Sequence, residues 1–215
     1  MLRIQKMDLL ISFYIGCIAI SELMGSKTFP LFNIGSIQLS SSVAIFVVPL
    51  IYGINDVIIE VYGKERARSI VRSGLLVILF LLLFSIFATR LPSTPRFAST
   101  EKAYETIFTV SARISAASLI AFTTAEFLDV FIFAKLRQKF GNKALWFRTN
   151  ASNIISLFFD TSLFMILAFY SLNRPFGDNA SFLVGLIIPY WILKCLMSVL
   201  ETPLVYLGVK WLKEK

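Results

Sequence analysis

The sequence predicts an all-α integral membrane protein with six transmembrane helices and both termini in the cytoplasm. Of its 215 residues, 57% are hydrophobic and only 16% are charged, whereas soluble domains average about 45–50% and about 25%. The mean hydropathy is +0.76. Six apolar stretches are long enough to cross about 30 Å of hydrocarbon, and the basic residues gather on one side of them. We therefore expect a single transmembrane transporter domain over residues 1–215.

The first three expected helices cover residues 8–29, 40–60 and 69–89. The first resembles a signal peptide, but it is too long, contains Glu22 and lacks a cleavage site, so we expect a retained helix. Asn33 and Gly35 separate it from the second helix. The third is an aliphatic run interrupted only by Gly74 and Ser85, which favours a helix that faces lipid.

The last three expected helices cover residues 110–134, 151–171 and 183–207. Turn-forming residues separate them, and these are Pro92, Pro95, Gly141, Asn142, Asn173, Pro175 and Gly177. No stretch sustains the two-residue alternation of a barrel strand. Because helices satisfy their own backbone hydrogen bonds in lipid, an all-helical membrane domain is favoured.

The orientation follows from the basic residues, which crowd the loops and termini of one expected face. That face carries Arg3, Lys6, Lys64, Arg66, Arg68, Arg72, Lys135, Arg137, Lys139, Lys143, Arg148, Lys210, Lys213 and Lys215. The other face carries only Arg90, Arg96, Lys102 and Arg174. The positive-inside rule then predicts cytoplasmic termini. The net charge of +8 is therefore a sign of topology and of contact with the lipid bilayer, and no nucleic-acid partner is expected.

The residue counts argue against an enzyme. The chain has no histidine, so Ser-His and Cys-His nucleophile pairs and histidine zinc sites are excluded. Cys17 and Cys195 lie in separate apolar runs and form no metal or disulfide spacing. Gly25, Ser26 and Lys27 lack the upstream glycine of a phosphate-binding loop. We expect no catalytic residue, no cofactor and no metal site.

Polar residues inside the apolar stretches are the best indicators of a binding site. A charged side chain at mid-membrane costs at least about 2.5–3.5 kcal/mol, so it persists mainly where it faces a cavity, a partner or a substrate. The fifth stretch places Asn153, Ser156 and Asp160 on one helical face. The sixth places Trp191, Lys194, Ser198 and Glu201 on another, between Pro189 and Pro203.

Two further stretches contribute candidates for which pairing within the protein is an alternative. In the second stretch, Asn55 precedes Asp56 and Glu60, and Glu60 could instead pair with Lys64. In the fourth, Glu126 and Asp129 could instead pair with Arg148 or with the Lys135–Lys139 cluster. The candidate substrate-binding residues are Asn55, Asp56, Glu60, Asp129, Arg148, Asn153, Asp160, Lys194 and Glu201.

This mixture of carboxylates, amides, a central lysine and aromatic rings suits a polar planar solute better than a stream of ions. Carboxylates accept hydrogen bonds from ring N–H groups, whereas Asn and Lys donate to a carbonyl. Aromatic side chains stack on a planar ring. The sequence therefore predicts a small-molecule transporter.

Several motifs resemble those of the queuosine-precursor transporter family, also called the VUT family, and the similarity covers most of the chain. The motifs are Ile20–Lys27, Asp56–Gly63 with Ala67 and Arg68, Ala125–Val130, Trp146–Arg148, and Asp160 with Thr161. The resemblance implies a six-helix importer in the cell inner membrane. Its expected substrates are the 7-deazaguanine bases that feed the tRNA modification queuosine, namely the 7-cyano base, its aminomethyl derivative or queuine.

Under that resemblance, a guanine-like edge offers two N–H groups to one carboxylate and a carbonyl to one donor. The carboxylate would be Asp56, Asp129, Asp160 or Glu201, and the donor Asn55, Arg148 or Lys194. In a stand-alone transporter, Asp160 or Glu201 could couple transport to protons. The alternative is the substrate-binding S-component of an energy-coupling-factor complex, which would need an ATPase partner. A homodimer is left open by the sequence.

Overall fold

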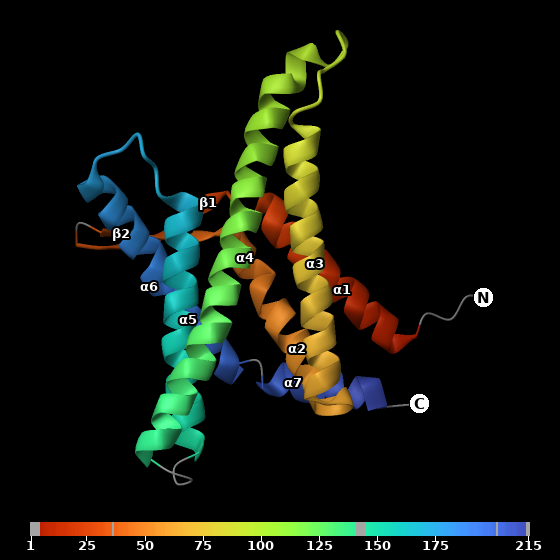
Figure 1. Ribbon diagram of the computed structural model, residues 1–215, viewed down its shortest axis with the longest axis vertical. Helices are drawn as coiled ribbons and strands as arrows, with labels where there is room; N and C mark the ends of the chain where they lie inside the picture. The colour runs from red at the N-terminus through yellow and green to blue at the C-terminus, as the bar shows by residue number, and fades with distance from the viewer. Residues whose placement is uncertain (1–4, 36, 141–144, 201, 214–215) are drawn as a thin grey trace. The chain divides into compact units, whose positions relative to one another are not determined.

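The chain folds as a set of apolar helices with one short hairpin, and the computed structural model describes residues 5–35, 37–140, 145–200 and 202–213 (Figure 1). The order of the elements is α1 (Lys6–Met24), β1 (Thr28–Ile34), β2 (Ile37–Ser42), η1 (Val43–Phe46), α2 (Val48–Tyr62), α3 (Lys64–Ala88), α4 (Ala98–Phe140), α5 (Leu145–Phe169), α6 (Phe176–Leu200) and α7 (Thr202–Lys213). The predicted helical class is confirmed.

Among the described residues, five helices are long and apolar enough to cross a membrane. They are Lys6–Met24, Val43–Tyr62, Glu65–Ala88, Ala98–Ala125 and Phe176–Leu196, while Ile154–Phe169 is a shorter apolar helix. A sixth span over α5 and the orientation of the termini therefore stay predictions. The expected stretch 183–207 is in fact divided, because α6 ends at Leu200 and α7 begins at Thr202 with Pro203 in its first turn. A proline is tolerated there because first-turn N–H groups have no helical acceptor.

The end of the expected first helix and the start of the expected second helix are not α-helical. The chain leaves α1 after Met24, and a two-stranded sheet of β1 and β2 follows, with Gly35 at a φ of +59° between the strands. Ser42 joins the two ends of this hairpin connection: its Oγ donates to the carbonyl of Gly25 over 2.6 Å and accepts from the N–H of Ala44 over 3.1 Å. The prediction of helix up to residue 29 and from residue 40 was wrong at these positions.

The described chain divides into two compact units. The first comprises Met1–Phe29, Ser41–Ala116 and Leu196–Lys215, and the second comprises Pro30–Ser40 and Ala117–Cys195. In the first unit, α2 packs against α1, α3 and α7. Glycines allow two of the close approaches there: a Cβ on Gly74 would lie 2.7 Å from Cδ1 of Ile18, and one on Gly208 would lie 2.7 Å from Cγ2 of Val57.

Gly63 makes the sharp change of direction between α2 and α3. Its φ of 83° and ψ of 166° fall in a region that is almost exclusive to glycine. Its N–H bonds to the carbonyl of Ile59, and its carbonyl accepts from Ala67, which is buried. The glycine of the Asp56–Gly63 motif therefore has a structural role as the link between two helices.

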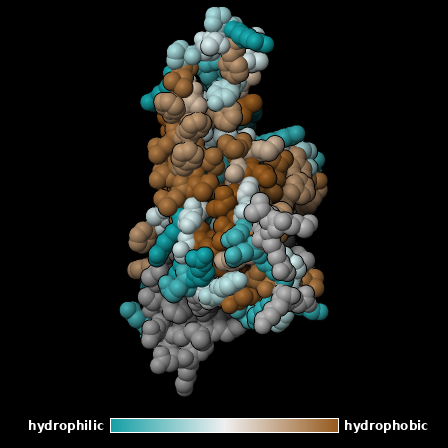
Figure 2. All heavy atoms as spheres, turned by 90° about the vertical axis from the view of Figure 1, so that its right-hand side faces the viewer, coloured by the Kyte–Doolittle hydropathy of each residue, from teal (hydrophilic) through white to brown (hydrophobic). Residues whose placement is uncertain are grey.

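The outer face of α3 is apolar, as the aliphatic run predicts. Its large exposed side chains include Leu76, Leu79, Phe80, Leu83, Phe84 and Phe87. Figure 2 views the side on which α1 and α3 lie in Figure 1 and shows a brown band over its middle with teal residues above and below. Such a surface suits hydrocarbon between two polar boundaries.

In the second unit, α5 and α6 are joined by a short connection that begins at Tyr170. Asn179, on the first turn of α6, is buried and bonds to the backbone of this connection. Further along, α6 continues through Pro189 without ending. These features place the middle of α6 beside α5, where the most informative polar contacts lie.

Candidate functional site

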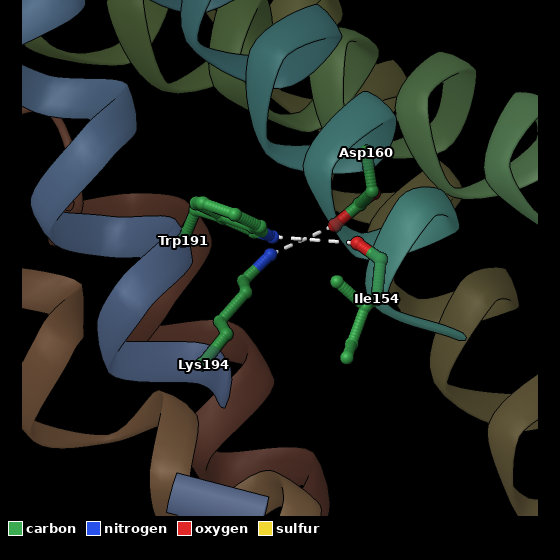
Figure 3. Close-up of polar contacts among 4 residues, drawn as sticks. All are labelled: Ile154, Asp160, Trp191 and Lys194. Atoms are coloured by element: carbon green, nitrogen blue, oxygen red, sulfur yellow. Dashed lines mark hydrogen bonds and ion pairs between the residues drawn. The ribbon is translucent and has the colours of Figure 1, made fainter. Parts of the chain in front are cut away.

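An ion pair joins α5 and α6. Nζ of Lys194 donates to Oδ2 of Asp160 over 2.8 Å, and the two side chains are only 10% and 21% exposed, respectively (Figure 3). The sequence predicted both residues as site candidates on separate helical faces, and the structure brings them together. Each charge offsets part of the cost of holding the other inside an apolar environment.

Aromatic rings lie beside this pair. The indole N–H of Trp191 donates to the carbonyl of Ile154 over 3.3 Å, and this bond crosses the ion pair in the view of Figure 3. Phe158 meets the Trp191 ring edge to face, with centroids 5.3 Å apart. Nζ of Lys194 also lies 5.8 Å from the ring centroid of Tyr190. The indole is therefore held in orientation next to two charged groups.

Helical spacing explains why the lysine is placed here. Leu183, Leu186 and Tyr190 are buried on one face of α6, and Lys194 follows Tyr190 by one turn on the same face. A lysine at the next position of a buried stripe must either find an anion or extend away from the core. Asp160 supplies that anion from α5.

Two hydroxyl residues next to Asp160 were not among the predicted site residues. Oγ1 of Thr161 and Oγ of Ser162 are buried and have no hydrogen-bond partner among the described residues. Sequence periodicity does not predict these unbonded hydroxyls, because Ser and Thr in helices usually donate to a preceding carbonyl of their own helix. Only the sequence neighbourhood of the mid-helix carboxylate could have drawn attention to them.

The candidates on α2 belong to the first unit and are less enclosed. Oδ1 of Asn55 is buried and has no hydrogen-bond partner within the described chain. Asp56 and Glu60 are exposed. The side chain of Lys64 lies outside the described residues, so the alternative pairing of Glu60 with it stays a prediction. The nearest ion pair that the structure shows joins Arg68 to Glu65 over 2.7 Å, with both side chains exposed.

The remaining predicted site residues cannot be placed. Glu201 and the side chains of Asp129, Arg148 and Asn153 lie outside the described part of the structure. Within the described residues, no group of three Cys, Asp or Glu side chains is arranged to hold a metal ion. The described polar groups beside α6 are one carboxylate acceptor and one cationic donor, next to an oriented indole, and such groups suit recognition of a polar solute.

Comparisons with known proteins point to solute transport. The model of a family described as "Putative vitamin uptake transporter" matches residues 42–208. A Bacillus subtilis protein named "Probable queuosine precursor transporter" is 29% identical over 161 residues, which cover 74% of this chain and 68% of that protein.

A Haemophilus influenzae protein with the same name is 31% identical over 129 residues, which cover 60% of this chain. That match spans about half, 52%, of the length of the Haemophilus protein. No solved structure matches the chain.

Proposed function

Since the chain belongs to the vitamin uptake transporter family, we propose that it imports queuosine precursors across the inner membrane for tRNA modification. The substrates proposed are 7-cyano-7-deazaguanine, its 7-aminomethyl derivative and queuine. The names of the two relatives support this class of solute. The several apolar helices long enough to span a membrane are consistent with a multi-pass transporter.

The observation that carries the proposal is the enclosed Asp160–Lys194 pair. A 7-deazaguanine base presents two N–H groups and a carbonyl along one edge. The Asp160 carboxylate can accept both N–H groups, and the Lys194 ammonium can donate to the carbonyl. The base would then replace the partner that each ion has in the structure, so neither charge is left without a hydrogen bond.

Trp191 adds a planar surface to this arrangement. Its N–H bond to Ile154 and its edge-to-face contact with Phe158 restrict the rotation of the indole. A fixed ring costs less entropy when it stacks on a planar substrate. We therefore assign stacking to Trp191 and hydrogen bonding to Asp160 and Lys194, while the other predicted residues stay candidates.

The test is uptake of labelled 7-deazaguanine bases into cells that cannot synthesise them. Cells that express the protein should accumulate label above the empty-vector level. Asp160→Asn and Lys194→Met should each reduce uptake by at least about tenfold. Each variant removes one charged group that would bond to the substrate, and it also leaves the other charged residue without its ion-pair partner. Asp178→Asn is the matched control, since Asp178 lies exposed at the start of α6.

Two results would count against the proposal. If well-expressed wild-type protein gives no uptake, the substrate class is wrong. If Asp160→Asn transports as well as Asp178→Asn, the site is elsewhere. The ATP-driven alternative is not favoured by the names of the relatives, and purified protein in liposomes separates the two, because an S-component would require added ATPase subunits. An uncoupler in the same assay reports on proton coupling.

A further inference from the structure

Thr161 carries a hydroxyl whose hydrogen-bonding capacity is unused in the described structure. The residue is 0% exposed, and its Oγ1 atom has no hydrogen-bond partner among the described residues. Water cannot reach a group enclosed to this degree without a path into the site. Buried hydroxyls in proteins are nearly always bonded, so an exception requires an explanation.

Other threonines of this protein show what a helix normally does with the group. Thr106, Thr123 and Thr124 each donate to the carbonyl four residues earlier, over 2.7, 2.8 and 2.8 Å. Thr161 has the same opportunity within α5, yet the structure shows no such bond. Its hydroxyl is therefore directed away from the usual backbone acceptor.

The position of Thr161 on α5 indicates where the hydroxyl is directed. Successive helical residues are separated by about 100°, so Phe158 lies about 160° around the helix from Asp160 and Thr161 lies about 100° from it in the same sense. Asp160 contacts Lys194, and Phe158 contacts Trp191, so both ends of this arc face α6. Thr161 lies between them, on the side of α5 that faces the site.

We infer that the Thr161 hydroxyl is a third polar ligand of the transported base, beside Asp160 and Lys194. The inference rests on the proposed function, and it adds a specificity-determining residue to that site. A hydroxyl both donates and accepts, so it suits a ring nitrogen with or without its proton. A planar heterocycle with nitrogen atoms on adjacent edges is the class of ligand that uses all three groups together.

Ser162 provides a matched comparison. Its Oγ atom is also buried without a partner among the described residues, but it lies about 200° from Asp160, outside the arc that faces α6. If unbonded hydroxyls on α5 were a general property of the helix, removal of either one should have the same effect. The inference requires that only removal of the Thr161 hydroxyl weakens substrate recognition.

The experiment compares Thr161→Val, Thr161→Ser and Ser162→Ala in the uptake assay, with thermal unfolding of each purified variant. Valine keeps the shape of threonine and removes only the hydroxyl. Thr161→Val should raise the KM about tenfold with an unchanged or higher unfolding temperature. Thr161→Ser and Ser162→Ala should stay within about twofold of wild type. If the hydroxyl had a purely structural role, Thr161→Val would lower the unfolding temperature and leave the KM unchanged.

The outcomes separate the inference from the proposed function. If Thr161→Val keeps the wild-type KM while Asp160→Asn loses uptake, the inference is wrong and the proposed site stands. If the wild type takes up none of the bases, both are wrong. If the valine variant does not fold, Thr161→Ala and Thr161→Ser give the same comparison. The inference holds if only the alanine variant raises the KM, and it fails if both variants or neither variant raise it.

Discussion

Asn179 and Ser171 exchange two hydrogen bonds across the connection between α5 and α6. Nδ2 of Asn179 donates to the carbonyl of Ser171 over 2.8 Å, and its Oδ1 accepts from the N–H of Ser171 over 2.9 Å. The same amide also donates to the carbonyls of Arg174 and Pro175. One buried side chain thus bonds to several backbone groups of the connection between the end of α5 and the start of α6.

Removal of this amide should destabilise the α5–α6 connection. We expect Asn179→Ala to cost about 1–3 kcal/mol, because the N–H of Ser171 and the carbonyl of Arg174 lose the hydrogen bonds that this amide makes with them. Thermal unfolding in detergent should show a lower midpoint. Asp178→Ala, at the exposed neighbouring position, should leave the midpoint unchanged, and equal midpoints for both variants would contradict the role given to Asn179.

The Asp160–Lys194 pair should show strong coupling in a double-mutant cycle. Removal of one partner of an enclosed pair leaves an uncompensated charge, which costs about 3–5 kcal/mol. We expect Lys194→Met to be less stable than the double variant Asp160→Asn with Lys194→Met, in which no charge is left. Thermal unfolding of the four proteins measures this coupling, and strictly additive effects would show that the two side chains do not interact.

The packing of α7 on α2 depends on the absence of a side chain at Gly208. A Cβ there would lie 2.7 Å from Cγ2 of Val57, so Gly208→Ala should destabilise the protein by about 1–3 kcal/mol. Val57→Ala removes the opposing methyl groups and should recover part of that loss when the two changes are combined. A double variant less stable than the sum of the single variants would argue against this contact.

Gly63 should tolerate substitution poorly because of its backbone conformation. Its backbone conformation, with φ at 83° and ψ at 166°, is strained for any residue with a Cβ and costs about 1–3 kcal/mol. Gly63→Ala should therefore lower the unfolding midpoint. Gly16 in α1 is the control, because a Cβ there meets nothing within 4 Å, and Gly16→Ala should be neutral or stabilising by up to about 1 kcal/mol.

Hydropathy predicted most of the helices, but it did not predict where they end. A break at Asn33 and Gly35 was expected between residues 29 and 40, but hydropathy gave no indication that this break is a β1–β2 hairpin that begins at Thr28 and ends at Ser42. The bond from Ser42 to the carbonyl of Gly25 joins residues on either side of the hairpin, and such a contact is not readable from hydropathy. The division of the last stretch near Pro203 has a local cause that sequence reasoning could have used, since a proline favours the first turn of a helix.

The sequence predicted candidate site residues but not how they are arranged. Asp160 and Lys194 were identified because charge inside an apolar helix is costly, but their pairing depends on how α5 and α6 pack. Thr161 was missed as a ligand because a threonine in a helix carries no periodic signal; only the three-dimensional structure shows that its hydroxyl lacks the usual bond.

Pro189 lies inside α6 and has no N–H to offer to the carbonyl of Gly185, four residues earlier. One backbone hydrogen bond of α6 is therefore missing between its first turn, where Asn179 bonds to the connection, and the turn that carries Lys194. A helix that lacks one of its backbone hydrogen bonds bends more easily at that point than an intact helix. A bend of α6 at Pro189 would therefore move Lys194 relative to Asp160 while the bonds of Asn179 to the α5–α6 connection stay in place.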